Sequence, residues 1–266
     1  MTTKTLSFQN TSISYRVAGS GDPVLLIHGF AEDSRIWDEL AASLADRYQL
    51  IIPDLPGSGK SALLEKQNVR LPDYADAMLA ILDAENIERA AWVGHSMGGY
   101  ISLAAAQQFP EKVTALLLFH SSAYADDDEK KETRRKAINL IKEKGSEAFL
   151  KTAIPGLFAD TDKSKSAIEN LQSLGRQFTP EALVQYYEAM IAREDTTEVL
   201  RSTDKPIGFI MGEHDKAVPF EHSLAQSHLP SMAHIYILRH SAHMGMLEET
   251  EKSLAFLTDF LAHIYV

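Results

Sequence analysis

The stretch Gly-His-Ser-Met-Gly-Gly occupies residues 94–99. It follows the apolar run 90–93 and precedes the helix-forming run 101–106, so it lies where a strand turns into a helix. Such a tight turn needs small residues at positions 94 and 98, because side chains there would collide with the neighbouring strand and helix. We therefore predict that Ser96 is a nucleophile. The alternative is a glycine-rich turn whose serine only caps the helix.

A serine hydroxyl needs a neighbouring base before it can attack a carbonyl. We predict that His243 is this base, because it lies in a loop after the apolar run 235–238. An amphipathic segment through Phe256 and Phe260 follows that loop, so the histidine returns to the strand end where the serine is expected. His240 is the alternative.

The base in turn needs an orienting carboxylate. We predict Asp215, which follows the apolar run 206–211 at the point where a strand gives way to a loop. The resulting order along the chain is serine, aspartate, histidine, which is the order typical of this architecture. Glu213 and Asp126 are the alternatives, and the aspartate would otherwise only shape its turn.

Attack on a carbonyl places negative charge on its oxygen, which two backbone N–H groups must stabilise. We predict that the amides of Met97 and Phe30 form this oxyanion hole. Met97 directly follows the predicted nucleophile, and Phe30 lies in the loop after the apolar run 24–27. Gly29 would let that loop approach closely.

Apolar runs and amphipathic segments alternate along most of the chain. The continuous apolar runs are 24–27, 50–54, 90–93, 113–119, 206–211 and 235–238. This pattern predicts an α/β fold, a mostly parallel, doubly wound sheet with helices on both faces, preceded by two antiparallel strands near residues 6–17. Sites in such sheets form at the carboxyl ends of the strands.

No strand is predicted between residues 122 and 200, where charged and amphipathic helical segments follow one another. We therefore expect a helical cap insertion over 122–200, and a core made of residues 1–121 and 201–266. Thr179 and Pro180 suit the start of one cap helix. The expected substrate-binding side chains are Phe30, Tyr124 and Met244, with Phe158 and Met190 as apolar residues that either line the pocket or pack the cap onto the core.

Composition limits the remaining classes of function. The chain has 266 residues, 45% of them hydrophobic, which suits one large globular domain with an insertion. Its formal net charge of −11 argues against nucleic acid or an anionic membrane as a partner. The sequence has no cysteine, no apolar leader and no run long enough to span a bilayer, so we expect a cytoplasmic protein. Its oligomeric state is not indicated.

Residues 57–61, Gly-Ser-Gly-Lys-Ser, look like the end of a phosphate-binding P-loop. The full motif requires a glycine at position 54, which is Asp54, and no helix is expected to begin there. No cluster of histidine and acidic residues has the spacing of metal ligands, and His95 is a motif neighbour rather than an evident ligand. We therefore expect neither a cofactor nor a metal.

Five motifs together resemble the α/β-hydrolase superfamily, in particular its small, cap-bearing, serine esterase-like members. They are residues 28–30, 54–61, 94–99, 212–215 and the Ala242-His243 loop, where many relatives have glycine in place of Ala242. Haloalkane dehalogenases and epoxide hydrolases of this fold use aspartate at the nucleophile position, so Ser96 argues against both activities.

The resemblance implies hydrolysis of a small carboxylic ester through an acyl-enzyme, with a small molecule as substrate. Cleavage of a carbon–carbon, thioester or amide bond by the same residues is an alternative within enzymes. A small-molecule receptor or signalling protein that keeps the serine, histidine and aspartate is an alternative of another class.

Overall fold

The predicted apolar runs form the centre of an eight-stranded sheet in a computed structural model, which describes residues 1–265. The strands are β1 (Thr2–Phe8), β2 (Thr11–Ala18), β3 (Asp22–Ile27), β4 (Tyr48–Pro53), β5 (Ala90–His95), β6 (Val113–Phe119), β7 (Ile207–Gly212) and β8 (Ala233–Leu238). Their order across the sheet is β1-β2-β4-β3-β5-β6-β7-β8. Strand β2 pairs antiparallel with β1 and β4, and all other neighbours are parallel. The predicted fold class is confirmed.

Burial explains why the central strands read as continuous apolar runs. Every residue of β5 and β7 is buried, and so are the last four residues of β3. A parallel strand covered by helices on both faces has no side that favours polar residues. Strand β8 is at the edge of the sheet, and its exposed and half-buried residues alternate more.

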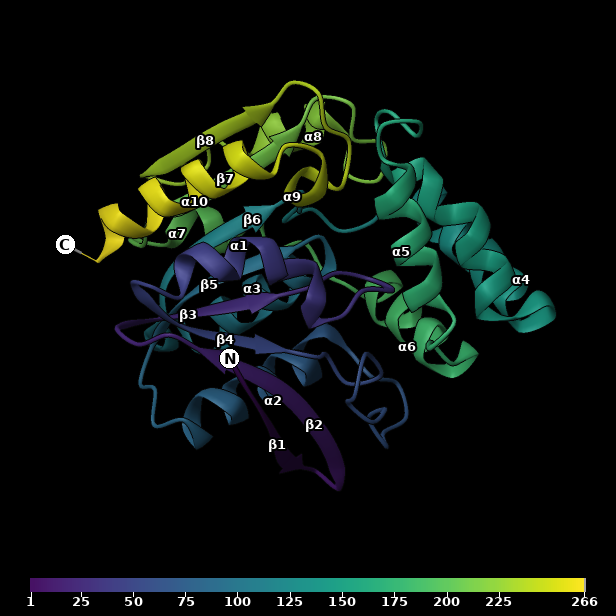
Figure 1. The fold of residues 1–266 in the computed structure, drawn as a ribbon, viewed down its shortest axis with the longest axis horizontal. Helices are drawn as coiled ribbons and strands as arrows, with labels where there is room; N and C mark the ends of the chain where they lie inside the picture. Colours follow the sequence, from purple (N-terminus) through teal and green to yellow (C-terminus); the bar gives the residue numbers. More distant parts are fainter. Residues whose placement is uncertain (266) are drawn as a thin grey trace.

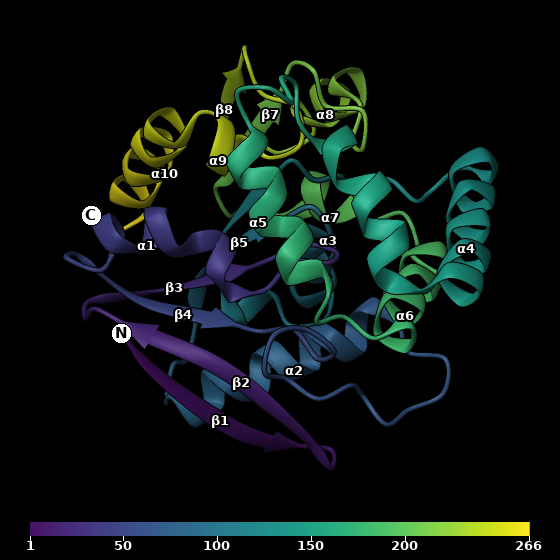
Figure 2. The same cartoon turned by 45° about the vertical axis from the view of Figure 1, so that its right-hand side comes forward.

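Helices lie on both faces of the sheet and at one side of it (Figure 1 and Figure 2). They are α1 (Asp38–Leu44), α2 (Leu71–Ala84), α3 (Met97–Gln108), α4 (Asp128–Ala153), α5 (Lys165–Gly175), α6 (Pro180–Ile191), α7 (Thr197–Ser202), α8 (Phe220–Gln226), α9 (Gly245–Glu248) and α10 (Thr250–Ile264), with short 3₁₀ turns η1 (Ser34–Trp37), η2 (Pro110–Lys112) and η3 (Ile154–Leu157). Helices α1 and α10 lie on one face, and α2 and α3 lie on the other (Figure 2). Among residues 1–265, no helix has the length and apolar character needed to cross a membrane.

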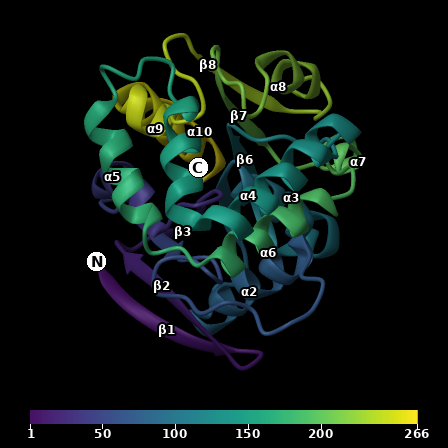
Figure 3. The same cartoon turned by 90° about the vertical axis from the view of Figure 1, so that its right-hand side faces the viewer.

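Helices α4, α5 and α6 pack against one another at one side of the sheet (Figure 1). Seen from that side, they lie in front of the sheet (Figure 3). Residues 122–200, all of which the structure describes, contain helices and no strand. Helix α7 packs instead against α3 of the core. The cap boundaries at 122 and 200 stay a prediction.

Helix α6 begins where the sequence predicts it and joins this helical layer to the core. Thr179 Oγ1 accepts a hydrogen bond of 3.2 Å from the Ala182 amide, and Pro180 occupies the first turn. Further along the helix, the Tyr186 hydroxyl donates to the Pro56 carbonyl oxygen at 2.7 Å and lies 2.7 Å from Ser58 Oγ. The helix is therefore anchored to the loop that follows β4.

We expect Thr179→Ala to lower the stability of the protein, because it leaves the Ala182 amide without its capping oxygen. The loss should be about 1 kcal/mol, which corresponds to a fall in Tm of about 2–4 °C for a chain of this size. Thr152 lies exposed within α4, so Thr152→Ala is the control and should leave Tm unchanged or raise it. Equal Tm values for the two variants would contradict the capping role.

Candidate active site

Ser96 lies in a sharp turn between β5 and α3, with φ 50° and ψ −115°. Residues other than glycine rarely adopt this backbone conformation, so the turn is strained. The flanking glycines permit it: a Cβ on Gly94 would lie 2.4 Å from the Gly98 carbonyl carbon, and a Cβ on Gly98 would lie 2.3 Å from the Ile27 carbonyl oxygen. As expected from the sequence, a side chain at either position would collide with a neighbouring helix or strand. The serine itself is only half-buried.

Asp215 and His243 meet at the ends of β7 and β8. Asp215 Oδ2 lies 2.8 Å from His243 Nδ1, and both residues are buried. The other carboxylate oxygen accepts hydrogen bonds from the amides of Ala217 and Val218, at 2.8 and 2.9 Å. Burial opposes the charge of Asp215, but the His243 imidazole and these hydrogen bonds lower the pKa of Asp215 below its ordinary value. An ionised Asp215 holds the His243 Nδ1 proton, which leaves Nε2 to act as a base.

The two alternative carboxylates are engaged elsewhere. Glu213 is exposed, and its Oε2 pairs with Arg239 Nη1 at 3.1 Å. Asp126 is buried between two guanidinium groups: its Oδ2 lies 2.6 Å from Arg134 Nε, and its Oδ1 lies 3.0 Å from Arg193 Nη2. Both carboxylates are thus paired with arginine side chains, which favours Asp215 as the partner of the histidine.

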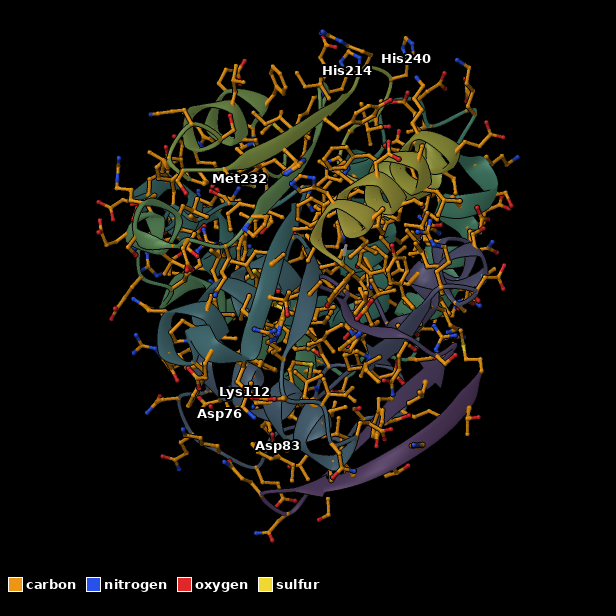
Figure 4. All side chains as sticks on the ribbon, turned by 90° about the vertical axis from the view of Figure 1, so that its left-hand side faces the viewer. Asp76, Asp83, Lys112, His214, Met232 and His240 are labelled. Atoms are coloured by element: carbon orange, nitrogen blue, oxygen red, sulfur yellow. The ribbon has the colours of Figure 1, made fainter. Side chains whose placement is uncertain are left out.

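His240, the alternative base, is exposed. Its side chain and that of His214 lie at the outer edge of the molecule (Figure 4). Only the backbone amide of His240 is anchored, by a hydrogen bond of 2.9 Å to Glu249. His240 is therefore poorly placed to receive a proton from the strand end where Ser96 lies.

His95 connects the turn of Ser96 to the loop of His243. Its Nε2 lies 2.9 Å from the His243 carbonyl oxygen, and the two imidazole centroids are 4.9 Å apart. The hydrogen bonds found within residues 1–265 include none from the Ser96 hydroxyl. The structure thus joins Asp215 to His243 directly, and joins His95, the residue before Ser96, to the backbone of His243. Contacts between a nucleophile and its base are often long before substrate binds.

The loop of Phe30 is held by His28, the residue that directly follows β3. His28 Nδ1 donates to the Gly29 carbonyl oxygen at 2.8 Å, while His28 Nε2 accepts a hydrogen bond of 2.9 Å from the Leu55 amide. The Gly29 carbonyl and the Phe30 N–H belong to one trans peptide unit, so they point in opposite directions. Anchoring the carbonyl therefore fixes the direction of the Phe30 N–H. Gly29 itself packs closely, since a Cβ there would lie 3.1 Å from Ser96 Cβ.

The peptide unit of Met97 is held in the same way. The Ser96 carbonyl oxygen accepts hydrogen bonds from Ser121 Oγ at 2.7 Å and from the Gly99 amide at 3.0 Å. The Met97 N–H lies on the other side of that peptide unit. Within the described part of the chain, neither it nor the Phe30 N–H has a hydrogen-bond partner. Both predicted oxyanion donors are thus free and fixed in direction.

The family model for the alpha/beta hydrolase fold matches residues 22–250. The chain belongs to this family. A protein of Mycobacterium tuberculosis described as uncharacterized is 39% identical over 114 residues, which are 43% of this chain and 33% of that protein. The chain thus covers about a third of that relative's length.

Two solved structures share the fold of this α/β hydrolase over nearly its whole length. A thermophilic esterase from Thermogutta terrifontis has a TM-score of 0.93 and 23% identity, with all of both chains covered. The enol-lactonase from Burkholderia xenovorans LB400 has a TM-score of 0.90 and 20% identity, covering 97% of this chain and 100% of that one.

Of the side chains expected to bind substrate, Phe30 lies where the core of this hydrolase meets α6. Its ring stacks on Tyr187 with centroids 4.3 Å apart, and it makes edge contacts with Phe149 and Tyr186. Because Phe30 is half-buried, part of the ring stays accessible. In this aromatic group Phe149 and Tyr186 are buried, while Phe30 and Tyr187 are half-buried.

Tyr124 and Met244 are placed differently. Tyr124 is half-buried, lies against His222 with ring centroids 6.3 Å apart, and lines a cavity of about 320 Å³ whose walls do not include Ser96 or His243. Met244 is fully buried next to His243. Phe158 and Met190 are also buried and pack into the core.

Sequence reasoning gave no role to His28, Ser121 or Glu32, and treated His95 only as a motif neighbour. Glu32 Oε2 lies 2.9 Å from His95 Nδ1 and accepts a hydrogen bond of 2.7 Å from the Gly29 amide. A polar residue within two positions of the end of a buried strand is the signal that could have found His28 and Ser121. Glu32 lies in a loop, and no periodicity marks it.

We expect Gly94→Ala to destabilise the protein strongly, because its Cβ would overlap the backbone of Gly98. The cost should be about 3 kcal/mol or more, measured by urea unfolding. A Cβ at Gly156 would meet nothing within 4 Å, so Gly156→Ala serves as the control and should unfold nearly like the wild type. Wild-type stability in Gly94→Ala would show that the turn tolerates a side chain.

Proposed function

We propose that this α/β hydrolase cleaves a small carboxylic ester through an acyl-enzyme intermediate. Ser96 would be the nucleophile, His243 the general base and Asp215 the residue that orients it. The observation that carries this proposal is the 2.8 Å contact between Asp215 and His243, at the same sheet edge as the strained turn of Ser96. The esterase and the enol-lactonase of the same fold, the latter acting on a cyclic ester, support this choice of bond.

In the proposed reaction, His243 Nε2 takes the proton of Ser96 as its oxygen attacks the ester carbonyl. The tetrahedral intermediate collapses, and the imidazolium gives that proton to the departing alcohol. Water then enters, loses a proton to His243 and attacks the acyl-enzyme, which releases the carboxylic acid and restores Ser96. Asp215 stays ionised throughout and stabilises the imidazolium in both halves of the cycle.

The amides of Phe30 and Met97 are the proposed donors to the carbonyl oxygen as it becomes negative. A donor of this kind is typically worth about 3 kcal/mol of transition-state stabilisation when it is already oriented. His28 and Ser121 supply that orientation, because each anchors the carbonyl of the peptide unit whose N–H is needed. The donors then need no reorganisation when charge develops.

Of the three side chains expected to bind substrate, we propose that Phe30 contacts it, because Met244 is fully buried and Tyr124 lines a separate cavity. The half-buried, stacked rings of Phe30 and Tyr187 suit an apolar acyl or alcohol group. Because Tyr186 and Tyr187 belong to α6, the proposed cap would set which groups fit.

We expect Ser96→Ala to abolish hydrolysis of 4-nitrophenyl acetate and butyrate, with kcat reduced by at least about 10³-fold because the nucleophile is lost. Asp215→Asn should lower kcat by on the order of 10³–10⁴-fold while KM changes little, since the asparagine leaves His243 in the wrong tautomer. A fluorophosphonate probe should label the wild type at Ser96, as read by mass spectrometry, and should not label Ser96→Ala.

Unchanged ester turnover in Ser96→Ala would overturn this proposal. Matched ester, thioester, amide and dienoate substrates would identify the bond, and faster turnover of any class other than the esters would replace ester cleavage by that reaction. A ligand-dependent change in partner binding with only a single turnover would indicate a receptor instead.

We expect Ser121→Ala to lower kcat about 10-fold with KM nearly unchanged, because it removes the shortest of the hydrogen bonds that hold the peptide unit of the Met97 N–H. Ser227→Ala is a matched control, since it also removes a hydroxyl that donates to a backbone carbonyl, at 2.8 Å from Leu224 O. Ester hydrolysis assays of both variants test this. A wild-type kcat in Ser121→Ala would leave the hydroxyl without a part in orienting the donor.

A further inference from the structure

Glu32 and His95 form a buried pair that the proposed chemistry does not use. Their side chains are 5% and 1% exposed, and Glu32 Oε2 lies 2.9 Å from His95 Nδ1. The same oxygen accepts the Gly29 N–H at 2.7 Å, and the other ring nitrogen of His95 lies 2.9 Å from the His243 carbonyl oxygen. One pair of side chains thus touches three segments of the site.

The partners fix the protonation of both groups. A carbonyl oxygen only accepts hydrogen bonds, so His95 Nε2 carries a proton and donates to His243. Glu32 Oε2 already accepts from Gly29, which suits a carboxylate that also accepts from His95 Nδ1. Burial opposes both charges, but their mutual attraction lowers the pKa of Glu32 and raises that of His95. These contacts and pKa directions favour an imidazolium paired with a carboxylate.

Other titratable groups surround this pair. His28 lies near Glu32, while Asp215, His243 and His120 lie near His95. Burial lowers the pKa of His120, which is therefore neutral. The imidazolium of His95 is balanced by Glu32 and Asp215, so a transient positive charge on His243 does not stand beside an unpaired cation.

We propose that Glu32 and His95 are positioning residues of this active site, which hold the Gly29 peptide and the His243 backbone in fixed places relative to Ser96. This inference rests on the proposed function. The spacing is tight, because a Cβ on Gly29 would lie 3.0 Å from His95 Nδ1 and 3.1 Å from Ser96 Cβ. A shift of the oxyanion loop therefore changes its distance to the nucleophile directly.

Removing either partner breaks more than one contact. Without the Glu32 carboxylate, the Gly29 N–H loses its acceptor and His95 loses its counter-charge. Without the His95 imidazole, the His243 carbonyl loses its donor. Misplacement of reacting groups by about 1 Å costs about 100-fold in rate, and here both the oxyanion loop and the base would be released.

We expect Glu32→Ala and His95→Phe each to lower kcat by about 100-fold, with KM within about threefold, in 4-nitrophenyl ester assays. Glu32→Gln keeps an oxygen for the Gly29 N–H but loses the charge that holds His95, so its kcat should fall about 10-fold. Glu85→Gln is the control, because Glu85 is also a largely buried, hydrogen-bonded carboxylate, bound to Lys4 and Tyr15. It should lose stability and keep the wild-type kcat.

Nitrogen NMR of the imidazoles tests the pair without any turnover. At pH 7 both ring nitrogens of His95 should be protonated in the wild type, and Nδ1 should lose its proton in Glu32→Gln. A neutral His95 in the wild type would overturn the ion pair.

The pH dependence of stability gives a second check that needs no substrate. A lowered pKa of Glu32 stabilises the fold above its ordinary value of 4.5, and this stabilisation is lost as the pH falls. A raised pKa of His95 stabilises the fold below its ordinary value of 6.5, and this is lost as the pH rises through the raised value. The Tm difference between wild type and Glu32→Gln should therefore be largest between about pH 4.5 and 6.5. A difference that does not vary with pH would contradict the charged pair.

The outcomes separate this inference from the proposed function. A wild type that hydrolyses no ester and resists the fluorophosphonate probe would overturn the function, and the positioning role with it. An active wild type with a wild-type kcat in Glu32→Ala would overturn the positioning role alone. A kcat loss in Glu85→Gln equal to that in Glu32→Ala would also overturn the positioning role.

Discussion

The close approach of α3 to the end of β3 makes the rest of the site possible. Gly98 lies so near that a Cβ there would be 2.3 Å from the Ile27 carbonyl oxygen and 2.7 Å from that of His28. This contact brings the start of α3, with the Ser96 turn, against the loop of Gly29. A larger residue would push the helix outward and separate Ser96, the proposed nucleophile, from the loop that carries the Phe30 amide, the proposed second donor. The other elements of the site are useful only at this spacing.

Two peptide units near that contact are held in the same way. In each, a side chain hydrogen-bonds to the carbonyl oxygen, and the N–H on the other side of the unit stays free. His28 does this for the unit that ends in Phe30, and Ser121 does it for the unit that ends in Met97. Each anchor lies directly beyond the end of a buried strand, or one residue later, so the sheet itself fixes it. Rigid strands thus fix the direction of one amide in a loop, that of Phe30, and one at the start of a helix, that of Met97.

The parts of this structure that could be predicted from sequence are those that short stretches determine. Buried strands appear as apolar runs, and Gly94 and Gly98 are readable because a sharp turn forbids side chains there. Asp126 and Asp215 both follow strands, and only the contacts of Asp126 with Arg134 and Arg193 separate them. Glu32 and His95 are far apart in the chain, and no local sequence pattern predicts that they pair. Such pairings follow from the packing of strands, which a single sequence does not contain.

The helical layer is also joined to the core through the loop of His243, the proposed base. The His243 amide donates to the Leu157 carbonyl oxygen of η3 at 2.9 Å. Glu248 accepts from the Ala159 amide at 2.7 Å and from the Ala242 amide at 2.8 Å, so one carboxylate holds both sides of this junction. The short segment 157–159 is therefore fixed relative to His243 by backbone and carboxylate contacts that do not depend on side chains of α4, α5 or α6. A change in the inner surface of those three helices would leave these contacts to the His243 loop in place.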